Sequence, residues 1–155
     1  MKISEKMLEK VETHKEKIGQ LLLRYTSLTE AQLNEALEVQ QETGHLVGEI
    51  LLRKNYIHPH DIIRVVCHQI EIPYIETILV EEIEENLISE LPINYCKHHE
   101  LLPLNSNNHS VNIVMTDPFN FEVLNDLQNL YKRPIHVSVS SPLRVADAIN
   151  RVFEK

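Results

Sequence analysis

Two stretches of this chain share one pattern of residues. LVGEILLRKNYIHPHDIIRVVCHQ, residues 46–69, follows KIGQLLLRYTSLTEAQLNEALEVQ, residues 17–40, and matches it position by position. Each copy has a glycine near its beginning, Gly19 or Gly48, and ends in a glutamine, Gln40 or Gln69. Glycine weakens a helix, so it is retained where something must come close to the backbone. We therefore expect a structural repeat in which the two glycines lie in equivalent environments.

Local signals make each copy a helix–turn–helix. In the first copy a short helix, 18–25, precedes Thr29, which has Gln32 three residues later in a capping-box pattern. The helix that follows, 30–42, should end at Gly44, which is a favoured residue after a helix. In the second copy a helix over 47–54 precedes Asn55, which tolerates a left-handed conformation, and Pro59 stands at the first position of the next helix.

The residues on either side of the repeats predict a different organisation. Residues 1–15 have apolar residues at every fourth position and read as a helix. A helix over 81–92 should place Ile83, Leu87 and Leu91 on one face. Strands are expected at 101–104, 111–115 and 135–140, with a helix over 119–131 that Asp117 and Pro118 start and a last helix over 143–153.

These elements predict an α+β protein. An N-terminal helical part with the tandem repeats, 1–70, precedes a small part, 71–155, in the order α-β-β-α-β-α, with helices on one face of a three-stranded sheet. We expect the two parts together to make one functional unit.

Composition excludes several classes of function. The formal net charge of −8 argues against a DNA or RNA binder, which needs a basic face. No stretch approaches the length of a membrane span, and the charged N-terminus does not read as a signal peptide. The 2 cysteines make no disulfide framework. A cytoplasmic protein, at most peripheral to the inner membrane through a partner, is the simplest interpretation.

The second helix of each copy has a face that could bind a ligand. Leu33, Leu37 and Gln40 stand at i, i+4 and i+7, and Ile62, Val66 and Gln69 have the same spacing. Aliphatic side chains supply contact area to a planar heterocycle, and an amide orients it by hydrogen bonds. Two such faces suit a ligand with approximate twofold symmetry. The alternative is structural, with each glutamine capping a carbonyl or meeting water in a packed helix.

The two copies resemble the tandem motifs of MshEN-type domains, which stand at the N-terminus of type II secretion (GspE-like) and type IV pilus (PilB-like) ATPases. The family motif begins Arg-Leu-Gly, continues with apolar positions and ends in Gln. The matching residues here are Lys17, Ile18, Gly19, Leu22, Leu33, Leu37 and Gln40 in the first copy, and Leu46, Val47, Gly48, Leu51, Ile62, Val66 and Gln69 in the second.

The resemblance implies a regulatory or docking domain that binds cyclic di-GMP, with one motif on each half of the ligand. The chain departs from the motif at its first position, where Lys17 and Leu46 replace arginine. Lysine meets a phosphate as a point charge without the planar fork of arginine, and leucine does neither. The alternative is a protein–protein adaptor that has lost nucleotide binding and recruits a component of the secretion or pilus machinery, with the acidic stretch 81–90 as the natural contact for a basic partner.

No sequence motif predicts catalysis or a metal cofactor. A GxxxxGK[ST] phosphate loop is absent, so an ATPase motor would have to lie downstream of this chain, or the chain is a freestanding domain. Cys67 and His68 are neighbours on a helix and point in different directions, which rules out a nucleophile–base pair. The histidines around Pro59 and the stretch 96–99 lack the convergent spacing of a metal site, and Asp117 reads as a helix cap. We expect a protein that is not an enzyme and has no cofactor.

Overall fold

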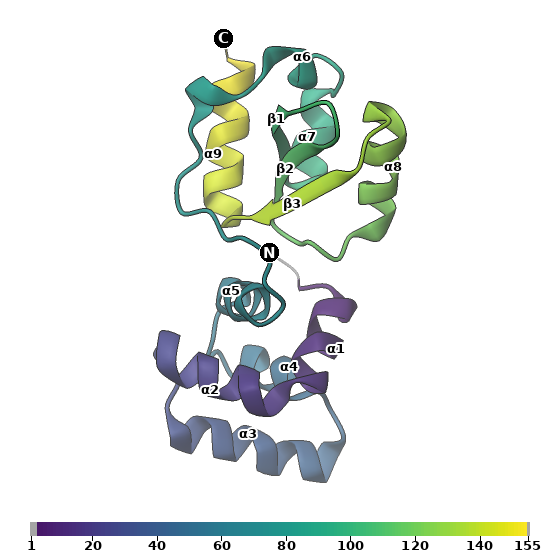
Figure 1. Ribbon diagram of the computed structural model, residues 1–155. Helices are drawn as coiled ribbons and strands as arrows, with labels where there is room; N and C mark the ends of the chain where they lie inside the picture. The colour runs from purple at the N-terminus through teal and green to yellow at the C-terminus, as the bar shows by residue number, and fades with distance from the viewer. Residues whose placement is uncertain (1–2, 155) are drawn as a thin grey trace. The chain divides into compact units, whose positions relative to one another are not determined.

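The computed structural model describes residues 3–154. They form two compact units, one ending at Glu71 and the other beginning at Ile72, which we call the repeat unit and the sheet unit (Figure 1). Together they make an α+β protein with a small three-stranded sheet. Within residues 3–154 no helix is long and apolar enough to cross a membrane.

The repeat unit consists of five helices. They are α1 (Glu5–Thr13), α2 (Lys15–Tyr25), α3 (Glu30–Thr43), α4 (Val47–Arg53) and α5 (Pro59–Gln69). The predicted helix over 1–15 corresponds to α1, and its residues 1–2 lie outside the described part. Thr29 and Gln32 form the predicted capping box, and Gly44 ends α3 in a left-handed conformation at φ 75°. Asn55 is left-handed at φ 58° and Pro59 is the first residue of α5, so these predictions are confirmed.

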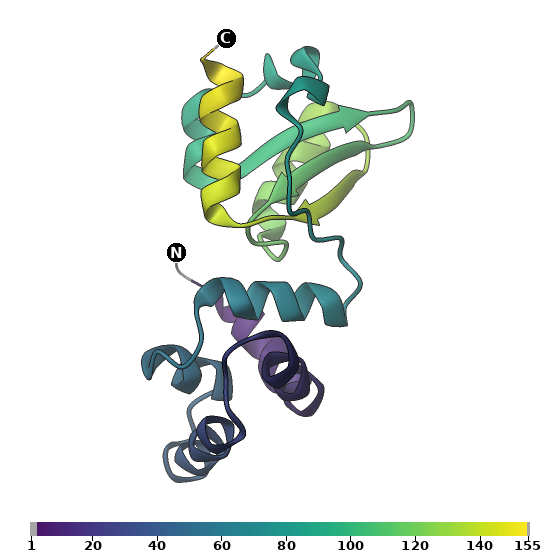
Figure 2. The same cartoon turned by 90° about the vertical axis from the view of Figure 1, so that its left-hand side faces the viewer.

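The two helix–turn–helix copies, α2–α3 and α4–α5, pack across each other. α2 packs mainly against α5, and α3 packs mainly against α4. Exchange of the two copies turns the first of these contacts into the second, which is the packing pattern of an approximate twofold axis. α3 and α5 lie on opposite sides of the pair α2 and α4 (Figure 2). The remaining helix, α1, contacts α4 and α5 of the second copy more extensively than α2 of the first.

The two repeat glycines are buried, but their neighbours differ. A Cβ added at Gly19 would lie 3.3 Å from Leu33 Cδ2, within the same copy. A Cβ added at Gly48 would lie 3.2 Å from Leu8 Cδ2 and 3.4 Å from Val11 Cγ1, both on α1. The expected close approaches are present, and the expectation of equivalent environments is wrong because α1 has no counterpart in the first copy.

The sheet unit contains the predicted three strands and their helices. They are η1 (Val80–Glu82), α6 (Glu85–Ile88), α7 (Ile93–His99), β1 (Leu101–Ser106), β2 (Val111–Met115), α8 (Phe121–Tyr131), β3 (Ile135–Val139) and α9 (Pro142–Phe153). The strand order is β1-β2-β3, with β1 antiparallel and β3 parallel to β2. The last helix predicted, over 143–153, is α9, which begins one residue earlier at Pro142 and is capped by Ser141.

Both faces of the sheet are covered. Ile113 and Val114 are neighbours on β2, so their side chains point to opposite faces, and both are fully buried. α8 and α9 lie on opposite sides of the sheet (Figures 1 and 2). The expectation of helices on one face is therefore wrong, and the consecutive apolar residues Ile113–Met115 of β2 are the pattern of a strand buried on both sides.

Two predicted elements of the sheet unit differ in detail. The helix expected over 81–92 is broken into η1 and α6, because the Glu84 N–H donates to the Leu104 carbonyl at 2.9 Å and the Glu84 carboxylate accepts from Ser106 N (3.0 Å) and Oγ (2.9 Å). These bonds to β1 hold Glu84 extended. Asp117 does not cap α8, because its Oδ1 accepts from Phe119 N–H at 2.8 Å in a turn, and Asn120 is the cap.

Candidate functional site

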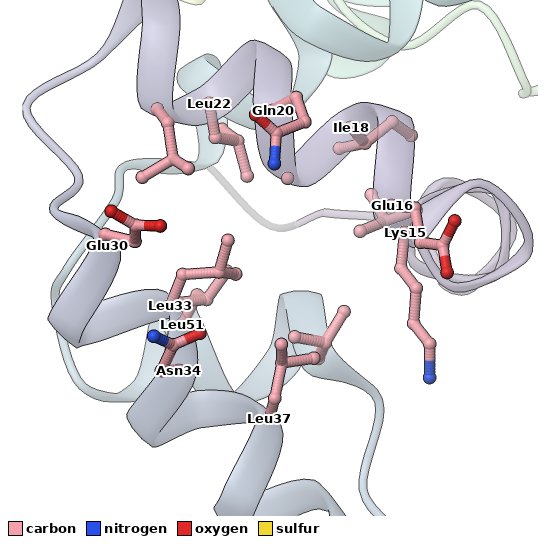
Figure 3. Close-up of a pocket in the computed structure, with 14 residues that line it drawn as sticks. Lys15, Glu16, Ile18, Gln20, Leu22, Glu30, Leu33, Asn34, Leu37 and Leu51 are labelled. Atoms are coloured by element: carbon pink, nitrogen blue, oxygen red, sulfur yellow. The ribbon is translucent and has the colours of Figure 1, made fainter.

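A groove of about 470 Å³ opens in the repeat unit between α2 and α3. Figure 3 shows side chains of the two helices, among them Gln20 and Leu33, facing each other across it. Its buried apolar lining comes from α1 and from both copies of the repeat, and consists of Val11, Ile18, Leu22, Val47 and Leu51. Its rim is polar. A cavity of this size with an apolar floor and a few polar groups has the character of a small-molecule site.

The groove contains part of the predicted ligand set. The members that line it are Ile18, Gly19, Leu22, Leu33, Leu37, Val47 and Leu51. The members outside its lining are Lys17, Gln40, Leu46, Gly48, Ile62, Val66 and Gln69. The first copy therefore supplies most of the lining, and the second supplies only its first helix.

The apolar face of α5 is part of the core. Ile62 and Val66 are each 0% exposed, whereas the matching Leu33 and Leu37 on α3 are half-buried and line the groove. A side chain with no exposed surface cannot touch a ligand without movement of the helix that covers it. In this conformation the two predicted faces are not equally accessible, and Gln69 is half-buried at the end of α5.

The Gln40 amide is already engaged within the chain. Its Nε2 donates to Glu12 Oε1 at 2.6 Å and to the His45 carbonyl at 3.1 Å, and its Oε1 accepts from Lys15 Nζ at 3.2 Å. These contacts agree with the alternative interpretation of Gln40, in which the glutamine satisfies polar groups within the packed protein.

Glu12 is the centre of this polar cluster, and sequence reasoning missed it. Its Oε1 also accepts from the Val47 N–H at 3.0 Å, at the first residue of α4, and its Oε2 lies 3.1 Å from Lys15 Nζ. Burial acts to raise the pKa of Glu12, but the hydrogen bonds from Val47, Gln40 and Lys15 act in the opposite direction and leave the pKa below its ordinary value of 4.5. Glu12 is therefore a carboxylate at neutral pH. Its only sequence signal was its position on the polar side of α1.

The rim of the groove was not predicted, although the sequence contained its signal. Lys15, Glu16, Gln20, Glu30 and Asn34 are exposed and line the groove. On α3, Glu30 and Asn34 alternate with Leu33 and Leu37 at i, i+3, i+4 and i+7, the spacing of one helix face. The same spacing on α2 joins Glu16, Gly19, Gln20 and Leu23. Extending the predicted faces by one turn would have found them.

The positions that depart from the family motif lie away from the groove. Lys17 is exposed on α2, and Leu46 is a half-buried residue immediately before α4. The cation that does line the groove is Lys15, which is 43% exposed and bonded to Glu12 and Gln40.

The remaining reactive side chains do not form a site. Cys67 and Cys96 are fully buried and form no disulfide, and burial raises the pKa of Cys96 to about 11, which keeps it a protonated thiol. Within residues 3–154, no group of three or more His, Cys, Asp or Glu side chains could hold a metal ion. The groove is therefore the candidate site, because motif residues of both copies line it.

The architecture defines a class of domain, in which a tandem helix–turn–helix unit precedes a small α+β unit. The chain belongs to the MshEN domain family, whose model matches residues 70–155. Among curated proteins it is 27% identical over 137 residues to the type IV pilus assembly ATPase PilB of Myxococcus xanthus (strain DK1622). That match covers 88% of this chain and 24% of PilB, so the chain spans about a quarter of the length of this relative.

Solved structures share the fold. A structure of MshE with cyclic di-GMP superposes with a TM-score of 0.59 at 21% identity, covering 87% of this chain and 97% of the MshE chain. The N-terminal domain of XpsE superposes with a TM-score of 0.54 at 18% identity, covering 88% of this chain and 94% of that one. At these identities the likeness establishes the fold.

Proposed function

We propose that this chain is a regulatory module of a secretion or pilus ATPase system and that its repeat unit binds cyclic di-GMP in the groove between α2 and α3. The observation that carries the proposal is the convergence of Ile18, Leu22, Val47 and Leu51, from both motif copies, on the floor of one cavity. Membership of the MshEN family and the fold shared with MshE, which has been solved with cyclic di-GMP, support it. In this proposal the chain itself catalyses no reaction.

The chemistry of the rim fits a guanine nucleotide. Leu33 and Leu37 offer an apolar surface to a planar base, while the amides of Gln20 and Asn34 and the carboxylates of Glu16 and Glu30 can pair with the donors and acceptors of guanine. Lys15 offers a positive charge to a phosphate.

The groove can be blocked without disturbing the core. Asn34 is exposed on α3 and lines the groove, whereas Glu38, one turn later on the same helix, is exposed and does not. Asn34→Trp should fill the opening and abolish binding of cyclic di-GMP, and Glu38→Trp adds the same bulk to the same helix and should bind like the wild type.

Calorimetric titration with cyclic di-GMP, at concentrations into the high micromolar range, tests whether the ligand binds in this groove. Binding by the wild type and Glu38→Trp, lost in Asn34→Trp, supports the groove. Equal binding by all three proteins places the ligand elsewhere. If neither the wild type nor a variant with arginine at positions 17 and 46 shows heat of binding, the proposal that the chain binds cyclic di-GMP is rejected.

The second candidate is a docking module that recruits a basic protein partner. It is favoured by the engaged Gln40 amide and by the acidic stretch, in which Glu81, Glu82 and Glu85 are exposed. Glu84 is excluded from such a surface because its carboxylate is bonded to Ser106. A Glu81/82/85→Lys variant should lose a salt-sensitive partner recovered from a bacterial lysate, whereas a partner lost only on Leu37→Asp would lie on the repeat unit. In either case the module is expected in the cytoplasm, reaching the inner membrane only through its partner.

A further inference from the structure

The helix α1 lies on the motif residues of the second copy. Leu8 Cδ2 and Val11 Cγ1 stand 3.2 Å and 3.4 Å from the position of a Cβ on Gly48, and α1 packs against both α4 and α5. The matching position in the first copy, Gly19, meets Leu33 of its own copy and lines an open groove. The faces that match by sequence therefore differ because one is open and the other is occupied by α1.

The polar end of α1 engages both motifs as well. The Glu12 carboxylate accepts from the Val47 N–H at the start of the second motif and from the Gln40 Nε2 at the end of the first. Val47 and Gln40 are both positions of the motif pattern. The apolar side of α1 thus covers the glycine of the second copy, and its carboxylate engages the Val47 N–H of the second motif and the Gln40 amide of the first.

We propose that α1 is an intramolecular occupant of the second half of the nucleotide site, and that a ligand that engages both motifs must displace it. This inference rests on the proposed function. α1 has 9 residues and joins α2 through the single residue His14, whose φ of −117° and ψ of 30° are not helical. A rotation at His14 would therefore move Leu8, Val11 and Glu12 together.

Such an occupant lowers the apparent affinity. If only a fraction of molecules has α1 displaced, the observed dissociation constant is the intrinsic value divided by that fraction. Loosening α1 should therefore strengthen ligand binding, although the altered residues contact no ligand in the groove that is open now. A purely structural α1 predicts the opposite, because its loss would weaken the fold of the site.

The variants follow from the contacts. Glu12→Ala removes the bonds to Val47 and Gln40, and Leu8→Ala removes the closest contact to Gly48 from a half-buried position. Glu9→Ala is the matched control, since Glu9 is exposed on the same helix. With the full chain and cyclic di-GMP, calorimetry should show about five- to tenfold tighter binding for Glu12→Ala, the scale of one lost hydrogen bond, and a change in the same direction for Leu8→Ala. Glu9→Ala should leave the affinity unchanged.

Amide hydrogen exchange of the wild type supplies the second readout. Saturating ligand should speed the exchange of α1 amides and slow the exchange of α2 and α3 amides. If the ligand binds but leaves the exchange of α1 amides unchanged, and all three variants bind like the wild type, α1 does not occupy the site. The proposed function would still stand in that case. Absence of binding in the wild type and in every variant, all folded by circular dichroism, overturns the proposed function and the inference together.

Discussion

The sequence-equivalent glycines of the two copies should respond in opposite ways to the same substitution. Gly19 lies inside the 11-residue helix α2, where alanine is favoured over glycine by about 0.8–1 kcal/mol. The new methyl group would meet Leu33 Cδ2 at 3.3 Å. Because Leu33 is half-buried and borders the groove, its flexible end can turn aside at small cost. Gly19→Ala should therefore raise the free energy of unfolding by about 0.5 kcal/mol.

Gly48 lies in the first turn of α4, where the gain in helix propensity is smaller. Its new methyl group would be confined by Leu8 at 3.2 Å and by Val11 at 3.4 Å to Cγ1 and 3.6 Å to Cβ. The contact that must give is Leu8 Cδ2, because Val11 lies at ordinary van der Waals distance. Val11 is 1% exposed and its branched side chain is stiff, so the methyl group cannot move toward Val11, and Leu8 has to turn aside or α1 has to shift. Overpacking of this kind costs about 1–3 kcal/mol, and Gly48→Ala should lower the free energy of unfolding by about 1 kcal/mol.

Thermal unfolding followed by circular dichroism at 222 nm measures the difference. A change of 1 kcal/mol shifts the melting temperature of a 60–100-residue domain by about 4–8 °C, so the two variants should melt about 6–12 °C apart. Hydrogen exchange of α2–α5 amides checks that the change lies in the repeat unit. If both variants shift the melting temperature equally and in the same direction, the reasoning that α1 packs mainly on one copy is refuted. If Gly19→Ala lowers the melting temperature by several degrees, the reasoning that Leu33 turns aside at small cost is refuted.

Two further predictions concern charge. Since the folded state lowers the pKa of Glu12 below 4.5, the stabilisation that Glu12 supplies should be complete above that pH and disappear as the pH falls through the lower folded value. Melting temperatures of the wild type and Glu12→Gln should therefore differ at about pH 7 and converge toward about pH 3, and a constant gap would contradict the role of the carboxylate, whose charged neighbour is Lys15. Lys17 and Leu46, the leading motif positions, lie outside the lining of the open groove, so arginine at both positions tests whether the ligand extends beyond that groove. A ligand that does so should bind roughly tenfold more tightly in calorimetry through bidentate phosphate contacts. An unchanged affinity would show that these positions do not meet the ligand.

Local signals in the sequence predicted the elements well. The capping box at Thr29 and Gln32, the left-handed Gly44 and the proline that begins α5 each depend on residues within a few positions of one another. Such short-range preferences are readable because no other part of the chain has to be placed first. The three strands were found for the same reason, since their apolar runs are bounded by turns.

Apart from Asp117, whose turn with Phe119 is local, the errors share one cause, which is a contact with a residue distant in the sequence. Glu84 breaks the expected helix because Ser106, on β1, offers two donors, and Val114 is buried because the sheet has a second covered face. The lining of the groove was half predicted for a similar reason. Periodicity finds the face of a helix, but it does not say which faces meet solvent, so Leu37 and Val66 read alike although one is half-buried and the other has no exposed surface.

The asymmetry of the two copies is therefore a property of the helix that precedes them. A repeated sequence encodes two similar surfaces, but the single α1 lies mainly on the second of them, while its Val11 borders the open groove of the first. Its carboxylate reaches the first motif too, through Gln40, so the state of one copy is linked to the other by a side chain that belongs to neither. A twofold-symmetric ligand would meet a protein that is symmetric in sequence and closed on one side, and removal of α1 would be the step that restores the symmetry. Tighter binding by Glu12→Ala would then report the part of the free energy of that step that Glu12 contributes.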